Sequence, residues 1–122
     1  MKIKQLVYIS KATVPFTTDS LKELTEVANV NNEKLNVTGC MVYASGYFLQ
    51  LLEGSAESVD ILYRKIERDD RHKGTKLLLE SRVDEDRRLF DKWFMTSFNV
   101  DTTKDFPEEL KKNIAQIIRD QK

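Results

Sequence analysis

Two polar side chains, Tyr8 and Gln50, stand where the sequence otherwise predicts apolar strands. Gln50 lies within residues 47–52, where its neighbours on both faces of a strand are apolar. A buried amide must find hydrogen-bond partners or lose about 1–3 kcal/mol. The phenol of Tyr8, also in mid-strand, is a hydrogen-bond donor and a possible one-electron reductant. Gln50 therefore requires a hydrogen-bond partner, either from a polar ligand or from a neighbouring group of the protein.

Two adjacent amides, Asn31 and Asn32, stand near the end of a predicted helix and can offer donors and acceptors to a ligand between helices. A simpler structural explanation accounts for all four residues. In it, Tyr8 and Gln50 bond to each other or to the backbone, and the asparagines cap the helix. On the chemistry of the residues alone, this simpler explanation is favoured.

Catalytic and metal-binding constellations are hard to find. His72 is the only histidine and Cys40 the only cysteine, so a histidine-rich metal centre cannot form and a thiol dyad has weak support. Arg71 and His72 follow a predicted helix and could contact a phosphate, although a solvated turn is the favoured explanation on the residues alone. A phosphate-handling hydrolase would also need a nucleophile or metal that the sequence does not supply.

Length and composition predict one globular domain. The chain has 122 residues, of which 40% are apolar and 33% charged. Twenty basic residues balance twenty acidic ones, which argues against a nucleic-acid partner. One cysteine, no secretory signal and no apolar stretch of about 18 residues predict a cytoplasmic protein that does not enter a membrane.

Apolar periodicity predicts five strands and three helices. The strands are residues 3–10, 37–44, 47–53, 76–83 and 93–100, with Ser45 and Gly46 as a two-residue hairpin turn. The first helix is expected to open with a capping box of Ser20 and Glu23 and to end near Asn31. The other helices are expected over residues 55–67 and from Pro107 onward.

The order β-α-β-β-α-β, followed by one more strand, predicts an α+β ferredoxin-like fold. Both crossover helices then lie on one face of a mostly antiparallel sheet. The last helix carries an apolar stripe that includes Ile114, Ile117 and Ile118. We expect this helix, or a partner subunit, to cover the other face.

Several segments resemble, in order and spacing, the BLUF family of flavin-binding blue-light sensor domains. The resemblance covers about residues 3–100, and the sequence Phe-Leu-Gln-x-Leu-Glu-Gly with its spaced Tyr and Asn is its most specific part. The matching segments are residues 6–10, 31–32, 37–39, 47–54, 68–72 and 93–95.

The resemblance implies a noncovalent flavin, normally FAD, with FMN or riboflavin as other forms, held between the two crossover helices. By position, Tyr8 and Gln50 correspond to the family's photoactive tyrosine and glutamine. The other matching positions are Asn31 and Asn32 at the ring's amide edge, Lys65, Arg71 and His72 near the ribityl and phosphate groups, and Trp93 and Met95 as the signal relay. Ala28 replaces a serine found in several relatives, so a secondary hydrogen bond to the glutamine should be missing.

The implied function is that of a blue-light photoreceptor. Light-driven electron and proton transfer from Tyr8 to the flavin would rearrange the hydrogen bonds of Gln50 and give a red-shifted signalling state. We expect residues 1–100 to form the sensor, and residues 101–122 a linker and amphipathic helix that relays the signal.

The sensor is expected to have no turnover of its own, with a downstream effector protein or its own oligomer as partner; it could also be the excised sensor of a longer light-regulated enzyme. The alternative is a flavin-free ferredoxin-like interaction module, which would purify colourless.

Overall fold

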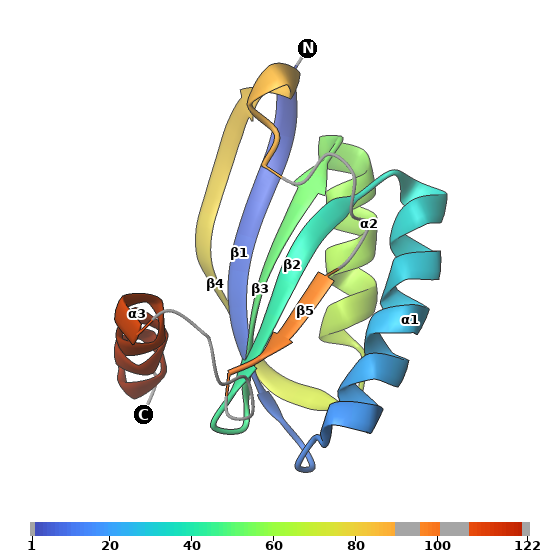
Figure 1. Cartoon of the computed structure of the whole chain (residues 1–122). Coiled ribbons are helices and arrows are strands. Elements are labelled where there is room, and N and C mark those ends of the chain that lie inside the picture. Colours follow the sequence, from blue (N-terminus) through green and yellow to red (C-terminus); the bar gives the residue numbers. More distant parts are fainter. Residues whose placement is uncertain (1, 90–95, 101–107, 121–122) are drawn as a thin grey trace.

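The computed structural model describes residues 2–89, 96–100 and 108–120 (Figure 1). One sheet has the strand order β4-β1-β3-β2-β5, with β5 parallel to β2 and every other pair antiparallel. The α+β ferredoxin-like prediction is confirmed. The strands are β1 (Lys2–Ala12), β2 (Thr38–Ala44), β3 (Tyr47–Gly54), β4 (His72–Asp84) and β5 (Thr96–Asn99), and the helices are α1 (Thr18–Leu35), α2 (Ala56–Glu67), α3 (Glu108–Arg119) and the short 3₁₀ helix η1 (Glu85–Arg87).

The hairpin between β2 and β3 forms where the sequence predicts it. Ser45 and Gly46 both have positive φ angles, 50° and 83°, as expected for a two-residue turn that follows the twist of the strands. The turn fixes the register that starts with Ala44 opposite Tyr47. Further along, a Cβ at Gly39 would lie 2.0 Å from the Leu51 carbonyl oxygen, so only glycine permits this close approach of β2 and β3.

The limits of α1 differ from the sequence prediction at both ends. Thr17, not Ser20, is the N-cap, and Ser20 takes the third helical position of a reciprocal capping box. The helix continues past Asn31 to Leu35, because Leu35 packs on the core and Asn36 ends the helix in the left-handed conformation with φ 54°. The asparagine pair at positions 31 and 32 therefore lies inside the last turns of α1 and does not cap it.

Strand β4 is longer than predicted. It begins at His72, because it pairs with β1 along nearly the whole length of that strand, from Lys2 opposite Asp84 to Ala12 opposite His72. Two irregularities in register interrupt this pairing, one of them between Val7 and Tyr8. The described part of the fifth predicted strand, β5, pairs with β2 over residues 96–99.

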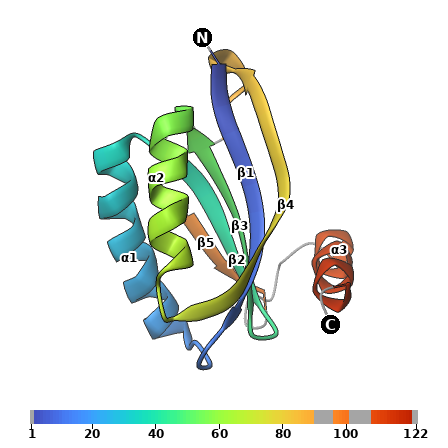
Figure 2. The same cartoon turned by 180° about the vertical axis from the view of Figure 1, so that it is seen from behind.

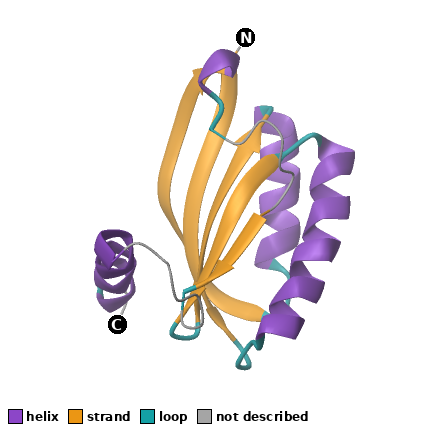
Figure 3. Cartoon of the chain, viewed as in Figure 1, coloured by secondary structure: helices purple, strands orange, loops and turns teal. Residues whose placement is uncertain are grey.

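Helices α1 and α2 cover one face of the sheet, and α3 lies on the other side (Figure 1; Figure 2 gives the view from behind). The main hydrophobic core lies under α1 and α2, where Leu6, Leu52 and Val59 are almost completely buried. A second, smaller cluster joins Ile114 and Ile118 of α3 to Ile9 and Ala44 on the opposite face. This arrangement of one densely covered face and one sparsely covered face is visible in Figure 3.

Candidate functional site

Tyr8 and Gln50 are direct neighbours in the sheet. The antiparallel register of β1 and β3 places Tyr8 opposite Gln50, on the face covered by α1 and α2. The Tyr8 hydroxyl donates a short hydrogen bond to Gln50 Oε1. Tyr8 is fully buried and Gln50 is 8% exposed. Of the partners that the sequence allows for these two side chains, the structure therefore shows a hydrogen bond between Tyr8 and Gln50.

The surroundings of Tyr8 keep its phenol protonated. The Tyr63 ring of α2 packs against it edge to face, with ring centroids 5.2 Å apart. Burial raises the pKa of the Tyr8 phenol well above its usual range, and the nearby Tyr63 phenol adds to the rise. Tyr8 thus holds its proton at Oη at any physiological pH and, among the described residues, donates it to Gln50.

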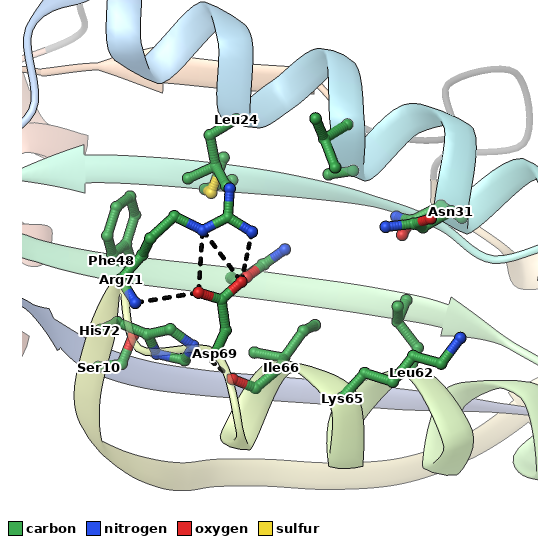
Figure 4. Close-up of a pocket in the computed structure, with 15 residues that line it drawn as sticks. Ser10, Leu24, Asn31, Phe48, Leu62, Lys65, Ile66, Asp69, Arg71 and His72 are labelled. Carbon is green, nitrogen blue, oxygen red and sulfur yellow. Dashed lines mark hydrogen bonds and ion pairs between the residues drawn. The ribbon is translucent and has the colours of Figure 1, made fainter.

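A cleft between α1 and α2 reaches down to this pair (Figure 4). It encloses about 720 Å³ of space when the open solvent at its mouth is included. Apolar side chains form its walls, with Leu24 and Val27 on α1 and Leu62 and Ile66 on α2. Gln50 reaches the cleft while Tyr8 stays behind it, so a flat guest would contact the amide first.

The predicted amide pair also borders the cleft. Asn31 is exposed and points into it, whereas Asn32 is 2% exposed and has side-chain or backbone partners in the protein. The carbonyl oxygen of Asn32 accepts the backbone N–H of Val37, which ties the end of α1 to the start of β2. Ala28, one turn earlier on α1, also lines the cleft. Its side chain is a methyl group and therefore cannot form a hydrogen bond with Gln50.

Two cations line the cleft at different places: Arg71 lies at the end away from Asn31, whereas the Lys65 side chain extends on the Asn31 side (Figure 4). The Arg71 guanidinium lies beside Asp69 with Nε 2.9 Å from Oδ1 (Figure 4). The hydrogen bonds from the Arg71 side chain lower the pKa of the Asp69 carboxyl below its usual range. Because Arg71 is partly exposed, its charge is within reach of an anionic group entering at the mouth.

His72 lines the cleft but has partners of its own. Its Nε2 lies 2.5 Å from the carbonyl oxygen of Ile66, at the end of α2, and its Nδ1 lies 3.4 Å from Thr75 Oγ1. The first contact fixes Nε2–H as the donor, because a carbonyl oxygen can only accept. His72 thereby links the start of β4 to α2, and its predicted contact with a ligand stays a prediction.

The sequence did not single out Ser10 or Asp69 as residues of the site. Ser10 is 2% exposed, lines the cleft, and its hydroxyl has no hydrogen-bond partner among the described residues. A buried hydroxyl without a partner points to a polar group that the cleft would receive. Its position two residues after Tyr8, on the same face of β1, was the available signal.

This set of side chains suits a flat ring with a polar edge and an anionic tail. Apolar walls would stack on the ring, the Asn31 and Gln50 amides would satisfy its edge, and Arg71 with Lys65 would attract the tail. The predicted relay residues, Trp93 and Met95, lie outside the described residues. Within residues 2–89, 96–100 and 108–120, no three His, Cys, Asp or Glu side chains are grouped as metal ligands, and no helix is long and apolar enough to cross a membrane.

Comparison with known proteins identifies the family of this chain. Residues 3–96 match the model of the family described as sensors of blue-light using FAD. The photoactivated adenylate cyclase subunit beta of Euglena gracilis is 31% identical over 119 residues, or 96% of this chain, but the match spans only 14% of that relative.

Solved structures agree with this result. A bacterial light-regulated adenylyl cyclase superposes with a TM-score of 0.84 at 34% identity, covering 98% of this chain and 34% of that one. BlrB, a BLUF protein in its dark state, has a TM-score of 0.80 at 22% identity and is covered over 83% of its length, which supports the fold alone.

Proposed function

This chain belongs to the family of blue-light sensors using FAD, and we propose that it is a photoreceptor domain whose photoactive pair is Tyr8 and Gln50. The observation that carries the assignment of the pair is their geometry. A fully buried phenol donates its only proton to an amide, and that amide borders a cleft fit for a flat ring. The acceptor already in place for the proton of this phenol is therefore the amide that borders the cleft.

Five other side chains would hold the flavin. Asn31 and Asn32 would bind its amide edge, and Lys65, Arg71 and His72 would stand towards its ribityl and phosphate groups. The support is that all five residues line the cleft, with Asn31 at one end and Arg71 with His72 at the other (Figure 4). We propose FAD as the form bound, because the matching family is described as using FAD and because Arg71 would favour a flavin that carries phosphate over riboflavin.

When bound and excited by blue light, a flavin supplies an oxidant strong enough to take one electron from a phenol. Loss of that electron makes the Oη proton of Tyr8 far more acidic than it is at rest, and the proton passes to Gln50 Oε1, its existing acceptor. When the electron returns, the proton returns to Tyr8 Oη. No atom is gained or lost, so Tyr8 regains its starting state while the Gln50 amide is left in a different arrangement until it reverts in the dark.

The lasting change resides in Gln50. Its side chain has a donor at one end and an acceptor at the other, so a rotated or tautomeric amide presents a different group to the cleft. The surrounding strands hold either arrangement, because Gln50 is nearly buried and lies opposite Tyr8 on one side and Met41 on the other. Such a two-state element can bias β5 and whatever packs on it.

We propose that the signal leaves through the segment that contains Trp93 and Met95 and through α3 to an effector, with residues 1–100 as the sensor. The similar proteins that are named photoactivated or light-regulated adenylyl cyclases suggest an effector domain of that kind, beyond the sensor itself. On this proposal the domain performs no turnover, and its output is a conformational change passed to an effector or to a second copy of the chain.

An absorption spectrum recorded before and after blue illumination tests the proposal. Pure protein incubated with FAD should be yellow, shift reversibly to the red in light and recover in the dark. Colourless protein that binds no flavin would contradict the proposal and favour the flavin-free interaction module.

Gln50→Leu tests the assigned amide. The variant keeps the size and burial of the side chain and should bind FAD, but it should not form the red-shifted state, because it offers no second arrangement of hydrogen bonds. A normal red shift in this variant would remove Gln50 from the mechanism.

A further inference from the structure

The second buried polar group of β3 is the carboxylate of Glu53, three residues after Gln50 and on the opposite side of the strand. It is 0% exposed. Its oxygens accept hydrogen bonds from Gln5 Nε2 at 2.7 Å and from the backbone N–H of Leu89 at 2.9 and 3.0 Å. Removing a carboxylate from water is costly unless hydrogen-bond donors surround it, so the fold depends on keeping these donors beside Glu53.

The contact with Leu89 has no counterpart in the ladder of the sheet. Leu89 belongs to the connection after η1, its side chain is 66% exposed, and it stands 36 residues from Glu53 in the chain. The backbone amide of Leu89 is therefore attached to β3 through the side chain of Glu53, because Leu89 lies outside the strands and has no backbone pairing of the sheet to hold it.

Arg88 strengthens the same attachment. Its guanidinium donates to the carbonyl oxygens of Asn36 and Glu53, at 3.1 and 3.2 Å, and pairs with Glu85 at 3.3 Å. Residues 88 and 89 are thus fastened both to the end of α1 and to the end of β3. Gln5 extends the network to β4, because it accepts a hydrogen bond from Ser81 Oγ at 3.0 Å.

The chain returns to the sheet at β5, where Thr96 lies opposite Cys40 of β2. The two described residues that flank positions 90–95, Leu89 and Thr96, are thus attached to β3 and to β2, respectively. These are the strands that carry Gln50 and its cross-strand neighbour Met41.

We propose that Glu53 is a positioning residue that fastens the start of the segment before β5, at the amide of Leu89, to the strand that carries Gln50. Through this contact a rearrangement of Gln50 would change the surroundings of Trp93. The light-dependent part of the inference rests on the proposed function, whereas the contact in the dark does not.

The test compares three variants of the whole chain. Glu53→Leu removes both acceptor oxygens at similar volume. Glu53→Gln keeps one oxygen that can accept from Leu89. Gln5→Met is the matched control, because it removes the other donor to the same carboxylate and leaves Leu89 attached.

Amide hydrogen exchange in the dark provides the first readout. The Leu89 amide should be protected in the wild type and in Gln5→Met, and it should exchange at least about tenfold faster in Glu53→Leu, as expected for a lost hydrogen bond to a charged group. Protection should return in large part with Glu53→Gln. Free exchange of Leu89 in the wild type would overturn the proposal, and this measurement holds even if Glu53→Leu does not fold.

The fluorescence of Trp93, the only tryptophan of the chain, provides the second readout. In FAD-loaded protein, the difference between light and dark emission should be lost in Glu53→Leu and kept in Gln5→Met, while both variants retain the red shift. A full Trp93 response in Glu53→Leu would refute the coupling. A wild type without any red shift would instead refute the proposed photoreceptor function, and exchange at Leu89 in the dark would still decide the contact.

Discussion

The two faces of the sheet are built differently. On the face under α1 and α2, a continuous apolar core surrounds Tyr8 and Gln50, and only the cleft interrupts it. On the opposite face, α3 rests on a smaller apolar cluster, and polar contacts around Glu53 occupy the other end. The difference indicates that the first face fixes the geometry of a site, while on the second face α3 should detach at a lower cost in free energy than α1 or α2.

Replacing the phenol on the densely packed face should have the largest effect. Tyr8→Phe keeps the ring packed against Tyr63 but removes the hydrogen bond to Gln50. We expect FAD to remain bound and the reversible red shift to disappear completely, since no electron and proton donor remains beside the amide. Absorption spectroscopy under blue light checks this, and an unchanged photocycle would contradict the role of Tyr8.

Equivalent truncations on the two faces should have unequal effects on stability. Leu52→Ala, at a position fully buried in the main core, should lower the free energy of unfolding by about 3 kcal/mol. Ile118→Ala should mainly free α3, seen as faster amide exchange in residues 108–120, with a smaller shift of the global denaturation midpoint. If Leu52→Ala and Ile118→Ala shifted the denaturation midpoint equally, the two faces would not differ in their contribution to global stability.

Removing the cation at the mouth of the cleft should have a moderate effect. Arg71→Ala is expected to weaken FAD binding about tenfold, because a charge-assisted hydrogen bond to phosphate is lost, and to change riboflavin binding little. Titration of the two flavins against the wild type measures both affinities. Lys34→Ala on α1, away from the cleft residues, is the matched control and should bind both flavins normally.

The smallest expected effect concerns Asp69. Because Arg71 lowers the pKa of this carboxyl in the folded state, its contribution to stability is present above the unfolded pKa of about 3.8 and is lost as the pH falls further. The pair is partly exposed, so the contribution should stay below about 1 kcal/mol. Urea denaturation of Asp69→Asn should show a small deficit against the wild type at pH 7 that disappears below pH 4.

Much of the fold could be predicted from local pattern. Strand alternation, helical spacing and the Ser45–Gly46 turn all depend on residues within one or two turns of each other, and the structure confirms the elements that they predict. The errors lie at element ends. Leu35 extends α1 and β1 extends β4, because packing against distant residues outweighs the local signal there.

The candidate site could be predicted less completely. Tyr8 and Gln50 attracted attention because polar groups in apolar strands are unusual, and Arg71 because a cation follows a helix. Ser10 and Asp69 carried no such signal. Ser10 becomes a candidate only because the structure shows that its buried hydroxyl has no hydrogen-bond partner among the described residues. Asp69 becomes a candidate only because the structure shows that it holds the side chain of Arg71 beside the cleft.

The sequence by itself determined roughly which residues form strands and helices. It also determined which residues of each strand lie on the same face as Tyr8 or Gln50, and which family the chain resembles. Only the tertiary structure decided that Tyr8 donates to Gln50, 42 positions away, and that Glu53 reaches Leu89. The physical reason is that alternation and helical spacing follow from covalent geometry over a few residues. Contacts between distant residues depend instead on strand register and on the packing of the whole chain.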